Sequence, residues 1–157
     1  MRVRIAAVGR LPTCAPEAAL ITDYLGRFEQ TGRALGLGPV QVVEVEDRRR
    51  GGRAGEAALL ERQIPSGAPV IALDERGRSL SSPDFAAELA RYRDDGRSDA
   101  VFLIGGADGL DPALCARADL VISLGAMVWP HMLVRVMLAE QLYRAATILA
   151  GGPYHRT

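Results

Sequence analysis

The chain has 157 residues, of which 48% are hydrophobic and 24% are charged, and these values fit one globular domain large enough to bury a core. Nineteen basic and nineteen acidic residues give a formal net charge of zero, which argues against the strong positive field of many nucleic-acid-binding domains. The amino-terminal segment lacks the apolar core of a signal peptide, and no apolar run is long enough to span a membrane. We therefore expect a cytoplasmic protein.

Two further compositional features narrow the possible chemistry. Every basic residue is an arginine, which we interpret as a composition bias of the source genome. Cys14 and Cys115 stand alone, without a Cys-x-x-Cys pair or a Cys/His cluster. We therefore predict neither a metal site nor a disulfide framework.

The first part of the chain alternates between strand and helix patterns. Residues 2–8 are a β-branched run that ends at Gly9, and they predict a strand. Apolar residues at four-residue spacing then predict a helix over 16–31. After a glycine-rich loop, a second strand is predicted over 40–45.

Residues 46–55 contain the run R-R-R-G-G-R, and a charge run of this kind predicts a flexible, solvated loop. Arginines on such a loop also form bidentate pairs with phosphate, so a contact with RNA stays open. A short helix is predicted over 56–64 and a third strand over 70–73. The sequence D-E-R-G-R that follows this strand predicts a turn.

The second half of the chain predicts two more strands and three helices. Serine and proline residues around position 82 are typical of a helix start. In chain order, the predicted elements are a helix over 82–95, a strand over 100–104, a helix over 112–118, a strand over 120–123 and a helix over 131–150.

This alternation predicts a single α/β domain over residues 1–157, with a mostly parallel sheet covered by helices on both faces. Ligands of such sheets bind beyond the carboxyl ends of the strands. Three ends suit this role: Leu73, Gly105 and the loop at 124–129. Neither G-x-G-x-x-G nor a P-loop is present, which argues against the usual dinucleotide and nucleoside-triphosphate sites.

The titratable chemistry is concentrated at the C-terminal end. The segment after residue 120 holds both histidines, His131 and His155, and the only tryptophan, Trp129. It contains three arginines but a single acid, Glu140, which is spaced to pair with Arg144 on one helix face. We therefore place the active site in this segment.

Apolar residues surround most of the last predicted helix. One face can pack on the sheet, but a helix that is apolar nearly all round also needs burial elsewhere. A central helix of the domain and a dimer interface are both compatible with this pattern. We favour a homodimer through this helix, because large exposed apolar surfaces usually mark contacts.

Several motifs occur together in this chain: L-I-G-G-A-D-G-L at 103–110, S-L-G-A-M-V-W-P-H at 123–131, L-V-R-V at 133–136, A-E-Q-L-Y-R-A at 139–145 and the terminal P-Y-H-R. Together they resemble the ribosomal RNA large subunit methyltransferase H family, a group of small SPOUT-class enzymes. The resemblance spans the whole chain and is most specific in its C-terminal half.

The resemblance implies a homodimeric α/β methyltransferase with a C-terminal trefoil knot, an exception to the usual unknotted topology. It also implies S-adenosyl-L-methionine as cofactor and methylation of N3 of a pseudouridine in large-subunit (23S) rRNA on the assembled ribosome. The cofactor positions that it implies are Leu73, Gly105, Leu124, Gly125, Ala126, Met127, Val128 and Trp129.

Methyl transfer to N3 requires alignment of donor and acceptor and loss of the imide proton. We predict His155 as the base or orienting group, Arg135 as a clamp on a phosphate or oxygen, and Tyr154 as a stacking partner of the target base. His131 and Arg156 are predicted to contact the substrate.

Some assignments stay open. A histidine beside a proline at a helix start can serve only as a cap, so His131 has a second possible role. Asp74 and Asp108 are alternatives that would hydrogen-bond a ribose. A SPOUT enzyme acting on another RNA, such as tRNA, and a non-catalytic RNA- or ribosome-binding module are compatible with the same fold.

Overall fold

The computed structural model describes residues 1–156, and Thr157 of the predicted domain lies outside the described residues. The elements are β1 (Arg2–Val8), α1 (Pro16–Gly32), the 3-10 turn η1 (Arg33–Leu35), β2 (Val40–Val45), α2 (Gly52–Glu61), β3 (Val70–Ser79), α3 (Ser82–Asp94), β4 (Asp99–Ile104), α4 (Pro112–Ala116), β5 (Leu120–Ser123) and α5 (His131–Leu149). Each predicted strand and helix is present, with changes at some of the ends.

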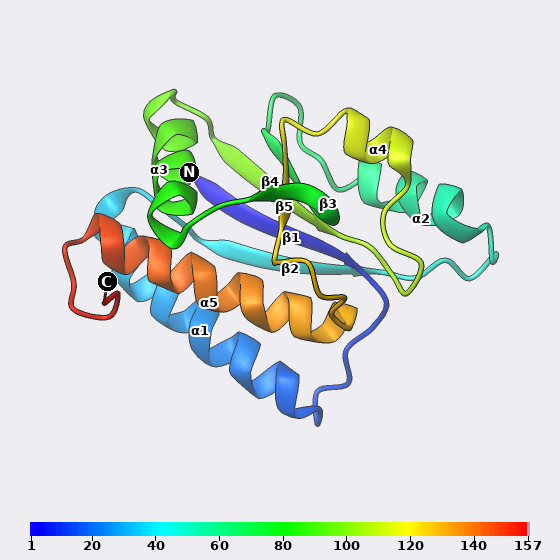
Figure 1. Ribbon diagram of the computed structural model, residues 1–157, viewed down its shortest axis with the longest axis horizontal. Coiled ribbons are helices and arrows are strands. Elements are labelled where there is room, and N and C mark those ends of the chain that lie inside the picture. Colours follow the sequence, from blue (N-terminus) through cyan, green and yellow to red (C-terminus); the bar gives the residue numbers. More distant parts are fainter. Residues whose placement is uncertain (157) are drawn as a thin grey trace.

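The strands form one parallel sheet in the order β2-β1-β4-β3-β5 (Figure 1). The central strand β4 is buried along its whole length, which explains why its sequence is almost entirely apolar. The register places Ile5 of β1 between Val42 of β2 and Phe102 of β4. The predicted parallel α/β sheet is therefore confirmed.

Helices cover both faces of the sheet. Helices α1, α3 and α5 lie on one face, while α2 and α4 lie on the other (Figure 1). Alternate residues of β1 point to opposite faces: Ile5 joins the core under α1, α3 and α5, and Val8 joins the core under α2 and α4. The two cores meet across the sheet.

Strand β3 is longer than predicted, because the D-E-R-G-R sequence forms a bulge rather than a turn. Both Leu73 and Arg78 lie opposite Ile122 of β5, so the residues between them bulge out of the pairing. A Cβ on Gly77 would lie 2.6 Å from the backbone carbon of Ile122, so this close approach requires glycine. The bulge directs the side chains after Leu73 toward the carboxyl edge of the sheet.

Two helices also differ from prediction at their ends. Helix α2 begins at Gly52 rather than at residue 56, because the Asp47 carboxylate accepts a hydrogen bond from the Gly51 N–H and organises the preceding loop. Helix α4 ends at Ala116 rather than at residue 118. The Arg117 and Ala118 N–H groups bond to carbonyls three residues back, which closes the helix in a tighter turn.

Within residues 1–156, no helix is both long and apolar enough to cross a membrane. Over the same residues, no cluster of histidine, cysteine and carboxylate side chains is arranged to hold a metal ion.

Candidate active site

A cavity of about 760 Å³ lies at the carboxyl ends of β3, β4 and β5. It is formed where the three predicted strand ends come together. The predicted cofactor positions that line it are Leu73, Gly105, Leu124, Gly125, Met127, Val128 and Trp129, whereas Ala126 is not among the lining residues. The parallel sheet thus gathers three segments that are far apart in the sequence.

The segment between β5 and α5 forms one wall of this cavity. Gly125 has φ 114°, a backbone conformation that favours glycine, and the Ser123 hydroxyl bonds to both its N–H and its carbonyl oxygen. Beyond this turn, Met127 and Val128 are 71% and 81% exposed. Large apolar side chains that are this exposed on a cavity wall are suited to cover an apolar ligand.

His131 begins α5 and also lines the cavity. No side-chain hydrogen bond caps this helix, so the structure gives His131 no capping role. Burial, together with the charge of Arg135, lowers the pKa of His131, so the imidazole is neutral at pH 7. A neutral ring at the cavity wall can offer one donor and one acceptor to a ligand.

Arg135 is buried and hydrogen-bonded within the fold, so it is not available to clamp a phosphate. Its side chain is 3% exposed and donates to the carbonyl oxygens of Val8 and Gly9 and to Glu44 of β2, at 2.6 to 2.8 Å. These bonds join the start of α5 to the carboxyl ends of β1 and β2. Spacing alone correctly placed Arg135 on the face of His131, but the packing of α5 on the sheet directs it inward. The structure makes it a positioning residue.

Asp74 and Asp108, the alternative ribose-binding residues, both line the cavity but differ in their surroundings. The Arg76 guanidinium donates to both Asp74 oxygens, at 2.8 and 3.0 Å, and holds the pKa of this carboxyl below its usual range. Asp74 is therefore charged and already paired. Asp108 follows the G-G-A turn and has no comparable pairing among the described residues.

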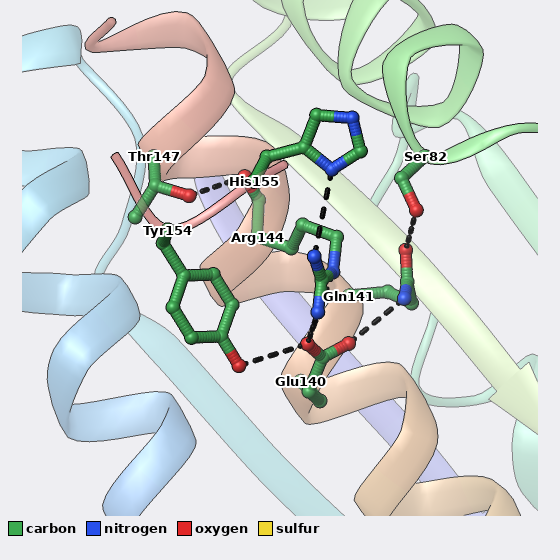
Figure 2. Close-up of polar contacts among 7 residues, drawn as sticks. All are labelled: Ser82, Glu140, Gln141, Arg144, Thr147, Tyr154 and His155. Atoms are coloured by element: carbon green, nitrogen blue, oxygen red, sulfur yellow. Dashed lines mark hydrogen bonds and ion pairs between the residues drawn. The ribbon is translucent and has the colours of Figure 1, made fainter. Parts of the chain in front are cut away.

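The residues after α5, 151–156, form a C-terminal tail that docks on this helix around Glu140 (Figure 2). The Glu140 carboxylate accepts hydrogen bonds from the Tyr154 hydroxyl at 3.0 Å, from Arg144 at 3.0 Å and from the Gln141 amide at 2.8 Å. Ser82 at the start of α3 donates in turn to Gln141. Glu140 therefore orders both the tail and the arginine that the sequence pairs with it.

The tail residues have defined protonation preferences in this arrangement. Burial and the bond to Glu140 raise the pKa of Tyr154 to about 12, so its phenol stays protonated at neutral pH. Arg144 donates to Nδ1 of His155 at 3.5 Å, which leaves the N–H of a neutral His155 ring on Nε2. Tyr154 packs at 4.6 Å between ring centroids against Tyr143 of α5. Arg156 is exposed.

The chain end follows the carboxyl end of α5 (Figure 1), whereas the cavity is lined by His131 at the amino end of this helix. His131 lies at the cavity, and Glu140 is further along the helix by roughly 13 Å at a rise of about 1.5 Å per residue. The tail residues Tyr154, His155 and Arg156 do not line the cavity. The structure therefore brings together the predicted cofactor residues and His131, but it does not bring the predicted catalytic tail to them.

Comparison with known proteins agrees with this fold. The family model described as "Predicted SPOUT methyltransferase" matches residues 1–155. A probable methyltransferase from Bordetella pertussis Tohama I has a TM-score of 0.53 at 16% identity, covering 92% of this chain and 96% of that one. A probable methylase family protein from Haemophilus influenzae Rd KW20 has a TM-score of 0.51 at 11% identity, over 99% of this chain and 70% of that one. The class defined by the fold and the cavity is the SPOUT methyltransferase.

Curated relatives narrow the class further. "Ribosomal RNA large subunit methyltransferase H" from Ruegeria pomeroyi is 68% identical over 156 residues, which is 99% of both chains. The protein of the same name from Roseobacter denitrificans is 69% identical with the same coverage. The chain belongs to the ribosomal RNA large subunit methyltransferase H family of SPOUT enzymes. The resemblance seen in the motifs is thus confirmed, whereas the trefoil knot stays a prediction.

Enzymes of this family use S-adenosylmethionine as methyl donor, and the cavity fits this cofactor. Its walls are largely apolar, with Leu73, Leu124 and Val128 available to an adenosyl group. Gly125 has open space beside it at the cavity wall, so its backbone groups are accessible for directional hydrogen bonds. Met127, Val128 and Trp129 are exposed on the wall of this cavity.

Sequence reasoning missed two features of this site. Ser82 and Gln141 brace Glu140, and no local spacing connects residues from α3 and α5. Arg53, on the first turn of α2, also lines the cavity. The arginine run around it was a visible signal, but only the folded sheet shows that this run ends beside the cavity.

Proposed function

We propose that this protein is a cytoplasmic homodimer that transfers a methyl group from S-adenosylmethionine to N3 of a pseudouridine in large-subunit rRNA, on the assembled ribosome. The observation that carries the proposal is the 68% identity, over 99% of both chains, to a protein named ribosomal RNA large subunit methyltransferase H. The pseudouridine and its N3 come from the motif resemblance. The cavity at the carboxyl edge provides the donor site.

Bound S-adenosylmethionine supplies an electrophilic methyl group on a sulfonium. For transfer, N3 must lose its proton to water and form a bond to the methyl carbon, while the carbon–sulfur bond breaks and leaves a neutral thioether. The residues of the chain align the two partners and exclude water from the donor, which accounts for much of the rate of such reactions. The apolar loop from Met127 to Trp129 suits this exclusion.

The tail supplies the groups that face the target base. With its N–H on Nε2, His155 acts as a donor that orients a uracil carbonyl and stabilises the negative charge that develops as N3 loses its proton. Tyr154, with a pKa of about 12, is no base and serves as a packing surface for the base. Of the two roles predicted for His155, this geometry favours the orienting one.

A second copy of the chain is needed if the tail acts at a donor cavity, because the two lie far apart on α5 within one protomer. Helix α5 also offers a surface for such a copy. Beside it lies a cavity of about 590 Å³ whose lining includes the apolar side chains of Leu80, Val136 and Met137. We therefore propose that the tail of one protomer completes the active site of its partner.

The test is a methyl-transfer assay with labelled S-adenosylmethionine on assembled ribosomes, free large subunits and bare rRNA, followed by mass mapping of the modified nucleoside. We expect incorporation into a pseudouridine of assembled ribosomes only, and its loss in His155→Ala. Arg27→Gln, an exposed change on α1, serves as the control. Cofactor binding without transfer to any of these substrates would instead indicate another RNA, and absence of cofactor binding would refute the methyltransferase assignment.

A further inference from the structure

Four exposed arginines follow β2: Arg48, Arg49 and Arg50 lie in the loop before α2, and Arg53 lies on the first turn of α2. We call this segment, residues 48–53, the arginine loop. Arg48 makes only a long ion pair of 3.8 Å with Glu46. The other three make no ion pair or side-chain hydrogen bond with another residue of the described chain, 1–156. A chain with no net charge therefore presents a local group of unneutralised guanidinium groups.

Neighbouring acids cancel only part of this charge, because Asp47 and Glu56 are engaged by backbone groups and Glu46 makes only the long pair with Arg48. The Asp47 carboxylate accepts hydrogen bonds from the N–H groups of Arg49 and Gly51, so it closes the loop from within. Glu56 faces the backbone of Gly106, and its pKa is raised chiefly by burial and then by the charge of Asp108. Asp47 and Glu56 are thus occupied by the backbone, while the guanidinium groups of Arg49, Arg50 and Arg53 are exposed and unpaired among residues 1–156.

The arginine loop is continuous with the donor cavity. Arg53, on the first turn of α2, lines the cavity together with Asp108 and the loop after β4. Arg48, Arg49 and Arg50 precede it by a few residues, in the loop that leads into α2. A nucleic acid that brings a base to the cavity would therefore pass its backbone close to this loop.

We propose that the arginine loop binds backbone phosphates of the RNA substrate beside the donor cavity, an inference that rests on the proposed function. Guanidinium groups pair with phosphate oxygens in a bidentate manner. The hydrogen bonds that the Asp47 carboxylate accepts from backbone N–H groups preorganise the loop, which lowers the conformational entropy lost on binding. The loop compensates for the absence of an overall positive charge by concentrating cations where the substrate must dock.

The test compares two variants of equal charge. Arg48→Gln/Arg49→Gln/Arg50→Gln removes three arginines of the loop without changing a residue that lines the cavity. Arg33→Gln/Arg62→Gln/Arg97→Gln removes three exposed arginines that precede β2, β3 and β4, on the amino edge of the sheet. Binding to assembled ribosomes is measured directly over a salt series, alongside the KM for ribosomes and the calorimetric affinity for S-adenosylmethionine.

We expect the loop variant to bind ribosomes at least about tenfold more weakly at physiological salt, with a slope of log affinity against log salt shallower by roughly 2 units. The KM should rise in parallel, while the affinity for S-adenosylmethionine and the binding of the control variant stay at the wild-type level. Equal affinities and salt slopes for the two variants would overturn the proposal. If wild type methylates ribosomes in that case, the proposed function stands and only the role of the loop is lost.

Discussion

Tyr154 donates a hydrogen bond of 3.0 Å to Glu140, and this bond holds the C-terminal tail against the middle of α5. The same carboxylate accepts a hydrogen bond from Arg144, which in turn contacts His155. One acid, the only one after Asp119 in the sequence, thus fixes three groups that the proposed reaction needs. The position of the tail depends on it.

Glu140→Gln is expected to lower the pKa of Tyr154 from about 12 toward the ordinary value near 10, because the charged acceptor is lost. Ultraviolet titration of tyrosine ionisation measures this change, with Tyr154→Phe identifying the signal. Methyl transfer should fall by about 10- to 100-fold as the tail loses its position. An unchanged high-pH titration would show that Glu140 does not hold Tyr154.

The raised pKa of Tyr154 also predicts a pH dependence of stability. The unfolded chain loses this proton near pH 10 and the folded chain near pH 12, so the stabilisation is complete below about pH 10 and lost as the pH rises to about 12. Chemical denaturation over this range should show a smaller loss for Tyr154→Phe than for wild type.

The lowered pKa of His131 predicts the opposite pH dependence of stability, which is lost as the pH falls rather than as it rises. The unfolded chain takes up a proton near pH 6.5, whereas the folded chain does so only at lower pH, so the free energy of unfolding should fall as the pH drops below about 6.5. Urea denaturation at pH 7.5 and 5.5 should show a smaller fall for His131→Gln. The same pH dependence in His131→Gln as in wild type would contradict the burial argument.

Arg135→Ala is expected to destabilise the fold by about 3–5 kcal/mol, because it leaves Glu44 and two backbone carbonyls without their buried partner. Arg27→Ala, which breaks an exposed ion pair on α1, should cost less than about 1 kcal/mol. Urea midpoints measure both. A comparable small loss for both variants would mean that Arg135 does not lock α5 to the sheet.

Mixed dimers test whether the tail acts in the partner. Gly125→Trp should inactivate the donor cavity, because φ 114° strains any side chain and the indole would occupy space at the cavity wall, and His155→Ala removes the tail group. When equal amounts of the two inactive variants are dissociated and reassembled, about a quarter of wild-type activity should return, because half of the dimers gain one complete site. No recovery, with mixed dimers demonstrated by differential tagging, would place tail and cavity in the same protomer.

Trp129 is the only tryptophan and is 39% exposed at the cavity wall. S-adenosylmethionine should therefore change its fluorescence in a saturable manner, and the same affinity should appear in calorimetry. Gly125→Trp is unsuitable here because it adds a second fluorophore. Val128→Asp is the comparison, because it places a charged group on the apolar wall of the cavity. Its affinity for S-adenosylmethionine should fall by about tenfold or more. A spectrum insensitive to the cofactor would argue against binding in this cavity.

The amino-acid sequence by itself determined much of this protein. Hydrophobic periodicity located the five strands, and the apolar character of β4 correctly predicted a strand buried on both faces. The same pattern predicted that three strand ends would line one cavity, because all parallel strands present their carboxyl ends at one edge. These features follow from local spacing and from the geometry of parallel sheets, so no contact between distant residues was needed to infer them.

Only the tertiary structure decided the rest. The D-E-R-G-R sequence reads as a turn by composition, but pairing with β5 makes it a bulge, since Gly77 admits the backbone of Ile122. Its spacing from His131 predicts that Arg135 is a free cation on the same face of α5, but the packing of this helix buries Arg135 against β1 and β2. Distances along a chain do not specify which groups become partners when its elements pack. For the same reason, the sequence placed His131 and His155 in one segment, whereas the length of α5 holds cavity and tail apart.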